Sequence, residues 1–174
     1  MIKMDNISEQ LVKINKTPKD LFLAGSIWVA AFVLVFCFVL FGLKNPAFFS
    51  LLFLLCIGVI FGAYKLSKML NVEYEYIVIN RDLDIDKITA ESSRKRIVSI
   101  KLNEVSDFGE FTAEKAAQLA NRHFDEKFIC CNQGDNAQYL TYKHPKKGMV
   151  LLVIAMNERT KAEALKSIPR TVIS

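Results

Sequence analysis

Three aspartates at alternate positions, Asp82, Asp84 and Asp86, form the pattern in this sequence that comes nearest to a metal site. Alternating carboxylates open the calcium loop of EF-hand proteins, which then needs a glycine at position six and a glutamate at position twelve. Lys87 and Ser93 occupy those two positions. The aspartates are therefore interpreted as the solvated face of a β-strand.

The other reactive side chains lack the partners that catalysis or metal binding requires. His123 and His144 are the two histidines, and neither has a carboxylate or cysteine at a ligand-like spacing. Cys130 and Cys131 are adjacent, and the chain has no C-x-x-C pair for zinc. No glycine-rich phosphate loop occurs among the seven glycines. We therefore predict no enzyme, no metal and no cofactor.

The elements that position the rest of the chain begin with two long apolar runs. Residues 21–43 contain no charged residue for 23 positions, and residues 45–64 contain none for another 20. A helix needs about 20 apolar residues to cross a ~30 Å bilayer core. Because only a short loop separates the runs, segment 18–70 is predicted to be a transmembrane helical hairpin, with spans at about 18–43 and 46–68.

The predicted spans have start signals and a charge bias. Thr17, Pro18 and Asp20 have the types and order of a capping box with proline at the first helical position. The lysines near the outer ends of the spans are Lys3, Lys13, Lys16, Lys19, Lys65 and Lys68, whereas the loop has only Lys44. Lysine-rich flanks stay in the cytoplasm. A multi-pass protein of the cell membrane with both termini cytoplasmic is predicted.

Small residues suggest how the hairpin packs. Gly58 and Gly62 are four residues apart on the second span, as are Ser26 and Ala30 on the first. Such pairs let helix backbones approach closely, and both lie in the cytoplasmic half. We expect them to face each other within the hairpin; dimerisation through Gly58 and Gly62 is the alternative. Neither apolar run, 21–43 or 45–64, contains a charged residue or histidine, so a channel or transporter is not expected.

The N-terminal segment, residues 1–17, precedes the hairpin. Met4, Ile7, Leu11 and Ile14 recur at spacings of three and four. This spacing predicts a short amphipathic helix, which would lie either in the membrane interface or on the soluble domain.

From residue 71 onward the apolar period changes to two, which indicates β-strands. The seven predicted strands cover residues 72–79, 83–88, 94–102, 105–111, 127–131, 138–143 and 149–155. A short helix is expected over 113–121. A C-terminal helix is expected after the cap Asn157, with Ala162, Leu165 and Ile168 buried and Pro169 ending it. This predicts an α+β domain over 71–174, a seven-stranded antiparallel curled sheet or barrel plugged by that helix.

This layout resembles the pleckstrin-homology (PH) superfold, and a two-helix hairpin leading into it resembles the bacterial PH-like (YdbS-type) membrane proteins. Residues 71–88, Arg94-Lys95-Arg96, residues 140–144 and residues 168–170 are similar to an uncharacterised two-span membrane protein family of Gram-positive bacteria. The second resemblance covers nearly the whole chain but implies no activity. The PH-like resemblance implies a binding module, by analogy of fold.

One basic run suggests a ligand. Arg94, Lys95 and Arg96, with Lys101 on the same strand, are placed where PH-type domains often meet lipid head groups. Each basic residue near an anionic leaflet contributes about 1 kcal/mol, and tethering lets a weak contact matter. In the alternative interpretation, Lys95 and Lys101 balance Glu73 and Glu75 across the sheet.

Net charge limits the choice of partners. Residues 71–174 carry 16 Lys and Arg against 15 Asp and Glu, so the basic excess of the chain flanks the spans and gives no support for nucleic-acid binding. We expect a non-enzymatic membrane-anchored module for anionic lipid head groups or a protein partner at the inner leaflet. The alternative is a structural subunit that packs through its hairpin with another membrane protein or with itself.

Overall fold

The computed structural model describes residues 7–173 and divides them into two units. The helical unit comprises Asn15–Val72 and Thr89–Ser93. The domain unit comprises the described part of Met1–Ile14, together with Glu73–Ile88 and Arg94–Ser174. Each unit is described by itself.

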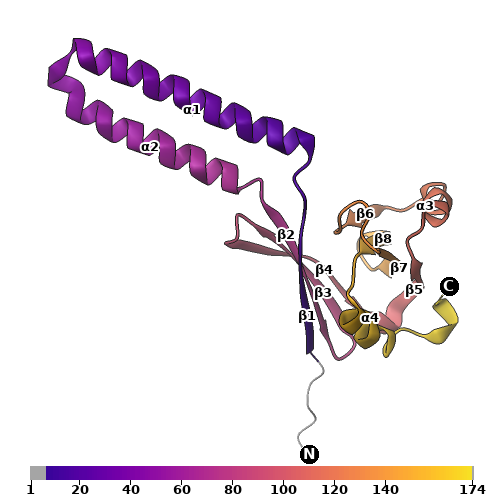
Figure 1. Cartoon of the computed structure of the whole chain (residues 1–174). Helices are drawn as coiled ribbons and strands as arrows, with labels where there is room; N and C mark the ends of the chain where they lie inside the picture. Colours follow the sequence, from indigo (N-terminus) through magenta and orange to yellow (C-terminus); the bar gives the residue numbers. More distant parts are fainter. Residues whose placement is uncertain (1–6, 174) are drawn as a thin grey trace, which may run out of the picture. The chain divides into compact units, whose positions relative to one another are not determined.

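The helical unit is built on two helices, α1 (Pro18–Lys44) and α2 (Phe49–Lys68), joined through the 3-10 turn η1 (Pro46–Phe48) (Figure 1). The predicted capping box is confirmed: Thr17 N donates to the Asp20 carboxylate at 2.9 Å, and the Thr17 hydroxyl accepts from Asp20 N at 3.3 Å. The predicted pair of helices is therefore confirmed, with bounds close to those expected.

The two helices contact each other through a row of residues that recurs every three or four positions. The more buried residues of the two helices include Ala24, Ile27, Ala31, Val35, Phe38 and Gly42 on α1, and Leu52, Cys56, Val59, Gly62 and Ala63 on α2. This period is that of antiparallel helices packed like a coiled coil. Gly42 marks the closest approach, because a Cβ built there lies 3.3 Å from Leu52 and from Phe49.

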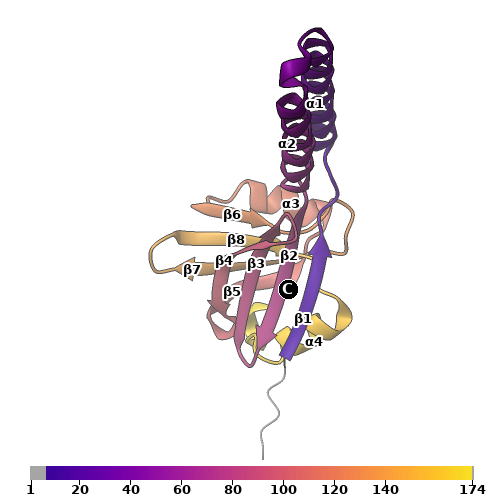
Figure 2. The same ribbon diagram turned by 90° about the vertical axis from the view of Figure 1, so that its left-hand side faces the viewer.

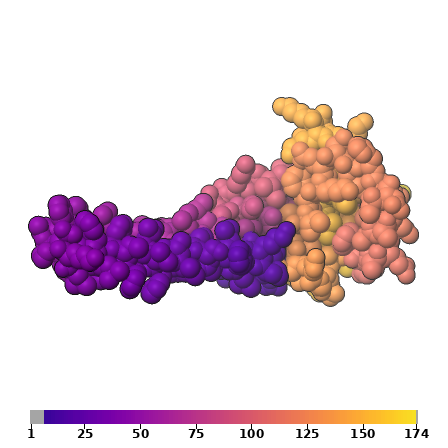
Figure 3. All heavy atoms as spheres, turned by 90° about the horizontal axis from the view of Figure 1, so that it is seen from above, coloured from indigo at the N-terminus to yellow at the C-terminus, as the bar shows by residue number. Residues whose placement is uncertain are grey.

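Most of the remaining hairpin surface is apolar and exposed. Side chains such as Phe22, Phe32 and Leu54 are more than 60% exposed, and the helices stand at the surface in the space-filling view (Figure 3). Both helices are long and apolar enough to cross a membrane. An exposed apolar surface of this extent is characteristic of a membrane-facing or partner-covered region.

The first sheet of the domain unit contains β1 (Ile7–Lys13), β2 (Val72–Ile79), β3 (Asp82–Thr89) and β4 (Ser93–Lys101), side by side in that order (Figure 2). β1 pairs with β2 in antiparallel register, from Ile7 opposite Ile79 to Lys13 opposite Glu73. The hairpin of α1 and α2 is therefore inserted in the connection between two neighbouring strands.

The amphipathic helix expected over residues 1–17 is wrong for the described residues, since residues 7–13 form β1; residues 1–6 lie outside them. Ser8 is buried and Val12 packs against the core, whereas Ile7 and Leu11 are about half exposed. A helix of this length is marginal by itself. Pairing with β2 satisfies the backbone of both strands, which outweighs the helix-like spacing.

The second sheet begins after the 3-10 turn η2 (Leu102–Glu104). Its strands are β5 (Val105–Glu110), β6 (Glu126–Ile129), β7 (Gln138–His144) and β8 (Gly148–Ile154), with α3 (Ala113–Ala120) between β5 and β6. The order is β5-β7-β8-β6, and β6 runs parallel to β8. The expected seven-stranded antiparallel barrel is therefore corrected to eight strands in two four-stranded sheets, one strand being parallel.

The main core lies between the two sheets. It joins Tyr76 and Leu83 of the first sheet to Leu140 and Leu152 of the second. The alternate residues of β8, Leu151 and Val153, face a second cluster that includes Leu119 of α3. Because β8 is covered on both faces, its sequence is a continuous apolar run.

The C-terminal helix α4 (Glu158–Leu165) begins at the predicted cap Asn157 and is followed by the 3-10 turn η3 (Arg170–Val172). Its buried stripe is Thr160, Ala164 and Ile168. Ala162 is exposed, so the expected stripe was wrong there, whereas Leu165 is partly buried and packs against the core. The stripe is displaced because the Thr160 hydroxyl bonds to Ser8 of β1 at 2.9 Å, a strand that the sequence did not predict.

Candidate functional site

The predicted basic run lies on the outer face of the first sheet, where its arginines are already paired. Arg94 lies 2.8 Å from Glu75, and Arg96 lies 2.8 Å from Asp84 and 3.0 Å from Asp86. The hydrogen bond that Arg96 donates to Asp86, with the charge of Asp84, raises the pKa of Arg96 above its ordinary value. We call these five residues the paired-charge face; its acids outnumber its arginines locally.

In β4 the alternation of inward-facing and outward-facing side chains is interrupted at Ile97 and Val98. Both arginines therefore lie on the outer face although the later part of the strand has the opposite alternation. Ile97 and Val98, adjacent in sequence, both contact the core. Ser99 and Arg96 both bond to the carboxylate of Asp84, at 2.6 and 2.8 Å, so they lie on the same side of the sheet. The aspartates are thus strand-face residues, as the sequence analysis interpreted them.

The two lysines of the run are differently placed. Lys95 and Lys101 form no ion pair among residues 7–173 and stand six positions apart, which is about 20 Å along a strand. The expected balance by charge pairs is present with other residues, because Glu73 pairs with Lys13 at 3.4 Å and Glu75 with Arg94. The structure does not gather these lysines into one site.

The small residues singled out in the hairpin do not make its contact. A Cβ built at Gly58 or Gly62 meets no atom within 4 Å, and Ser26 and Ala30 are exposed. The Ser26 hydroxyl donates instead to the carbonyl of Phe22, within its own helix, at 2.9 Å. Ser26, Ala30 and Gly58 therefore lie outside the row of more buried residues, whereas Gly62 is partly buried beside Ala63.

The remaining reactive side chains have structural surroundings. Burial raises the pKa of the Cys130 thiol to about 12 and that of Cys131 to about 11, which keeps both neutral. His144 Nδ1 accepts from the backbone of Lys146 at 3.1 Å. Within residues 7–173, no three histidine, cysteine or acidic side chains gather in a way that could hold a metal ion.

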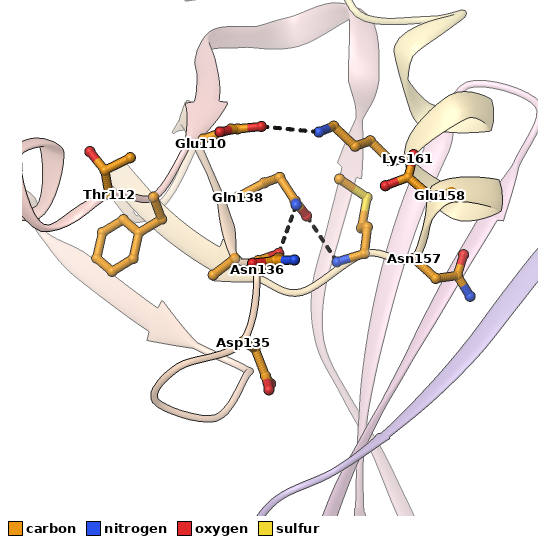
Figure 4. A pocket seen from close by; sticks show the side chains of 11 residues that line it. Glu110, Thr112, Asp135, Asn136, Gln138, Asn157, Glu158 and Lys161 are labelled. Atoms are coloured by element: carbon orange, nitrogen blue, oxygen red, sulfur yellow. Dashed lines mark hydrogen bonds and ion pairs between the residues drawn. The ribbon is translucent and has the colours of Figure 1, made fainter.

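A groove of about 600 Å³ lies in the domain unit between the end of β5, the segment before β7 and the start of α4 (Figure 4). We call it the α4 groove. Its lining residues are Glu110, Phe111, Thr112, Asp135, Asn136, Ala137, Gln138, Met156, Asn157, Glu158 and Lys161. It is an open, mostly polar depression beside an edge strand, since β5 ends the order of the second sheet.

The floor of the α4 groove is rigidly hydrogen-bonded. Gln138 is only 4% exposed; its amide donates to the carbonyl of Asn136 at 2.8 Å and accepts from the backbone of Met156 at 2.9 Å. Asn157 caps α4 by accepting from Thr160 N at 2.8 Å. These bonds tie the start of β7 to the start of α4, so the two walls are held at a fixed separation.

Strand β1 braces the same groove. The Gln10 amide donates to the carbonyl of Ala155 at 2.8 Å and accepts from the backbone of Asn157 at 2.7 Å. The groove thus depends on a strand that precedes the hairpin in the chain.

Acids outnumber bases along the α4 groove. Glu110, Asp135 and Glu158 line it, whereas Lys161 is its one lysine and already lies 3.5 Å from Glu110. The surplus of negative charge favours a ligand that carries a positive group at this end.

A second hollow of about 480 Å³ continues the α4 groove along β5. It shares Glu110, Thr112, Gln138 and Lys161 and adds apolar side chains that include Leu165 and Ile173. Ile173 forms a parallel bridge with Phe108 of β5. The chain's own C-terminal segment therefore touches this strand edge beside the groove, which shows that the edge accepts an extended backbone.

Sequence reasoning missed the α4 groove. Its residues come from three distant segments of mixed composition, and no motif links them. The one signal that pointed to it was the Asn157 cap, which located the start of α4 and with it one wall.

The architecture is that of a strand-rich domain of two packed sheets with a C-terminal helix, carrying a hairpin of two apolar helices, and this defines a PH-like protein of the two-span kind. A family model described as Bacterial PH-like domain (DUF6106) matches residues 4–174. The chain belongs to that family. No curated protein and no solved structure matches it.

Proposed function

We propose that the chain is a membrane-anchored, non-enzymatic binding module that displays its PH-like domain at the inner leaflet and binds a polypeptide segment of a protein partner in the α4 groove. The observation that carries the proposal is the combination of the groove's net negative charge with its position beside the end of β5 at Glu110, beyond the bridge between Phe108 and Ile173. An extended segment adding to a sheet edge gains backbone hydrogen bonds, and side-chain hollows beside the edge supply selectivity.

Insertion of the hairpin in the membrane is supported by its exposed apolar surface. Because β1 and β2 pair, the strand before the hairpin and the domain after it must lie on the same side of a membrane. An even number of spans meets that requirement. The excess of lysines at the outer ends of the hairpin supports the cytoplasmic side.

A photocrosslinking experiment in intact cells tests the groove. p-Benzoylphenylalanine at Glu158, which is exposed at the start of α4, is expected to give one discrete adduct. The same residue at Gln118, exposed on α3 outside the groove, is the matched control and should give none. Glu110→Arg, which reverses a charge at a side chain 75% exposed, should abolish the adduct. Equal labelling at both positions, or none at either, would contradict the proposal.

Recognition of anionic lipid head groups by Arg94, Lys95, Arg96 and Lys101 is less well supported. The arginines are held by carboxylates of the same face, and a phosphate would have to displace them. We therefore place the partner at the α4 groove.

Assembly with another membrane protein, or with a second copy, is the second candidate. The open face at Gly58 and Gly62 favours it, because small residues that contact nothing in the hairpin let another helix approach. If this holds, Gly58→Leu with Gly62→Leu should reduce the oligomeric mass or the co-purifying partners seen by native mass spectrometry. An unchanged mass spectrum would remove this candidate.

A further inference from the structure

A groove of about 750 Å³ lies within the helical unit, where the last turns of α2 meet the tip of the hairpin that joins β3 to β4. We call it the juxtamembrane groove. Its α2 side is formed by Phe61, Tyr64, Lys65, Lys68 and Met69, and its tip side by residues 89–93. Both sides belong to one compact unit.

Two contacts hold the tip against the end of α2 and the residues that follow it. The backbone of Ala90 donates to the carbonyl of Asn71 at 3.1 Å, and Lys68 lies 3.0 Å from the carboxylate of Glu91. Lys68 also stacks over the Tyr64 ring at 5.7 Å. Ala90 and Glu91 have φ of 56° and 59°, a conformation that residues other than glycine seldom adopt. The surrounding contacts thus maintain a fixed turn, which sets the position of Ser92 and Ser93.

The juxtamembrane groove contains one basic side chain whose charge is not balanced by an acid of the groove. Glu91 is matched by Lys68. Lys65 lies over the Phe61 ring at 5.6 Å, and among the described residues no carboxylate comes within ion-pair distance of it. The groove therefore has a net charge of about +1 at Lys65, with the hydroxyls of Ser92 and Ser93 on the opposite wall.

The α2 wall of the groove is apolar toward the span. Phe61 is 60% exposed, Tyr64 48% and Met69 57%. Aromatic rings with an adjacent lysine at the end of an apolar helix are the usual composition of a membrane–water interface. A ligand that fits has an apolar body, continuous with the apolar surface of α2, and one negatively charged head.

We propose that the juxtamembrane groove binds one anionic phospholipid of the leaflet in which α2 ends. Its phosphate lies between the Lys65 ammonium and the hydroxyls of Ser92 and Ser93, and its acyl chains lie along Phe61 and Tyr64. A single phosphodiester charge matches the single uncompensated cation. This inference rests on the proposed insertion of the hairpin in the membrane. It is separate from the α4 groove and does not depend on a protein partner.

Quenching by brominated lipids tests the site in the full-length chain. Trp28 is the single tryptophan, so Trp28→Phe with Phe61→Trp places one fluorophore at the groove. The chain is reconstituted in vesicles of phosphatidylcholine and phosphatidylglycerol, with one lipid brominated at a time. We expect quenching at position 61 to report about a five-fold preference for phosphatidylglycerol, the size expected for one lysine near an anionic phosphate.

Three variants identify the contacts. Lys65→Gln should lower the preference to about one-fold, and Ser92→Ala with Ser93→Ala should lower it about two-fold, the size of one weak neutral hydrogen bond. Lys44→Gln, in the last turn of α1 at the far end of the hairpin, is the matched control and should leave it unchanged. A preference that persists in Lys65→Gln, or that ignores the serine changes, overturns the site. Protection of the buried Cys130 from a thiol reagent verifies folding in every variant.

A second fluorophore separates the two proposals. Phe53→Trp, again with Trp28→Phe, reports the half of α2 nearer the loop, where the side chain is 62% exposed. Both lipids should quench it equally. Quenching there without a preference at position 61 would refute the lipid site alone. No quenching at position 53 would refute the insertion of the hairpin, and with it the lipid site.

Discussion

Two basic clusters of this chain differ in what their charges already contact. In the paired-charge face, Arg94 and Arg96 each lie about 3 Å from a carboxylate of the same sheet. In the juxtamembrane groove, Lys65 lies over the Phe61 ring and forms no ion pair with a described residue. The first cluster is a run of three in the sequence, whereas the second is an isolated lysine at the end of a helix.

The difference shows that a run of basic residues indicates a binding site only if those residues are not already paired with acids of the same protein. Arg96 of β4 pairs with Asp84 and Asp86 of the neighbouring strand β3, and Arg94 pairs with Glu75 of β2, two strands away. Lys65 lies at the end of a span where acids are scarce. Its charge therefore remains available although nothing in its neighbourhood stands out as a motif.

The largest expected effect tests whether the paired-charge face is structural. Arg96→Met leaves Asp86, whose side chain is only 6% exposed, without its partner. Because the Asp86 carboxylate would be left buried without this partner, we expect a clear loss in the free energy of unfolding, moderated by the solvent screening of the half-exposed Arg96. Labelling of Cys130 in increasing urea, with the other cysteines replaced by alanine, measures it. Lys95→Met is the control and should change stability by less than about 0.5 kcal/mol. If the two substitutions lowered stability equally, the ion pairs of the paired-charge face would not have the structural role proposed for them.

The next largest effect compares a closely packed position of the hairpin, Gly42, with an open one, Gly58. Gly42→Leu forces a side chain into a space where a Cβ already lies 3.3 Å from Leu52, and should destabilise the hairpin by about 2 kcal/mol. Gly58→Leu enters open space and should not destabilise it. Titration of SDS into detergent micelles, followed by far-UV circular dichroism, compares the two. A larger loss for Gly58→Leu would show that the open face is occupied.

The stability of the folded domain is expected to depend on pH in the alkaline range, which limits the pH at which these variants can be compared. Burial raises the pKa of Cys130 from 9.0 to about 12, so the folded state keeps its thiol neutral where the unfolded state ionises. Stability is therefore complete below pH 9 and falls between pH 9 and 12, by up to about 1.4 kcal/mol per pH unit for this group.

A variant isolates that alkaline slope. In Cys130→Ala, the dependence of the urea midpoint on pH above 9 should be shallower than in the parent chain. The remaining slope belongs to groups such as Tyr142, whose pKa burial raises to about 12. An unchanged slope would mean that Cys130 is accessible in the folded state.

The smallest expected effect concerns Lys95 and Lys101, the two lysines of the basic run that form no ion pair among residues 7–173. Lys95→Gln with Lys101→Gln should change the preference for phosphatidylglycerol, measured in the full-length chain by the quenching of position 61, by less than about two-fold. Lys65→Gln is the matched comparison. If the double change removes as much preference as Lys65→Gln, lipid recognition extends to the domain.

The sequence predicted those parts of the fold that local chemistry determines. The Thr17–Asp20 capping box and the Asn157 cap are contacts between residues three positions apart, and both are confirmed. The strand positions followed from their period of two. By contrast, β1 owes its conformation to β2, which lies beyond the whole hairpin in sequence. A pattern within residues 1–17 could not reveal that partner.

The candidate sites were less predictable for a related reason. Gly58 and Gly62 have the expected spacing, but which face of α2 meets α1 depends on the complete row of contacts, and Gly42 occupies the close approach instead. The α4 groove joins Glu110, Gln138 and Lys161 from segments that only the second sheet brings together. Spacing along the chain carries no information on such meetings.

The pairing of β1 with β2 also sets an order of events during synthesis. The ribosome releases β1 before the hairpin and β2 after it, so β1 has no neighbour until both helices have been made. In an inserted chain, a nascent β1 carried to the wrong side could never meet β2. If the hairpin inserts as proposed, the first sheet, and the Gln10 brace that depends on it, forms only in molecules whose two helices were threaded correctly.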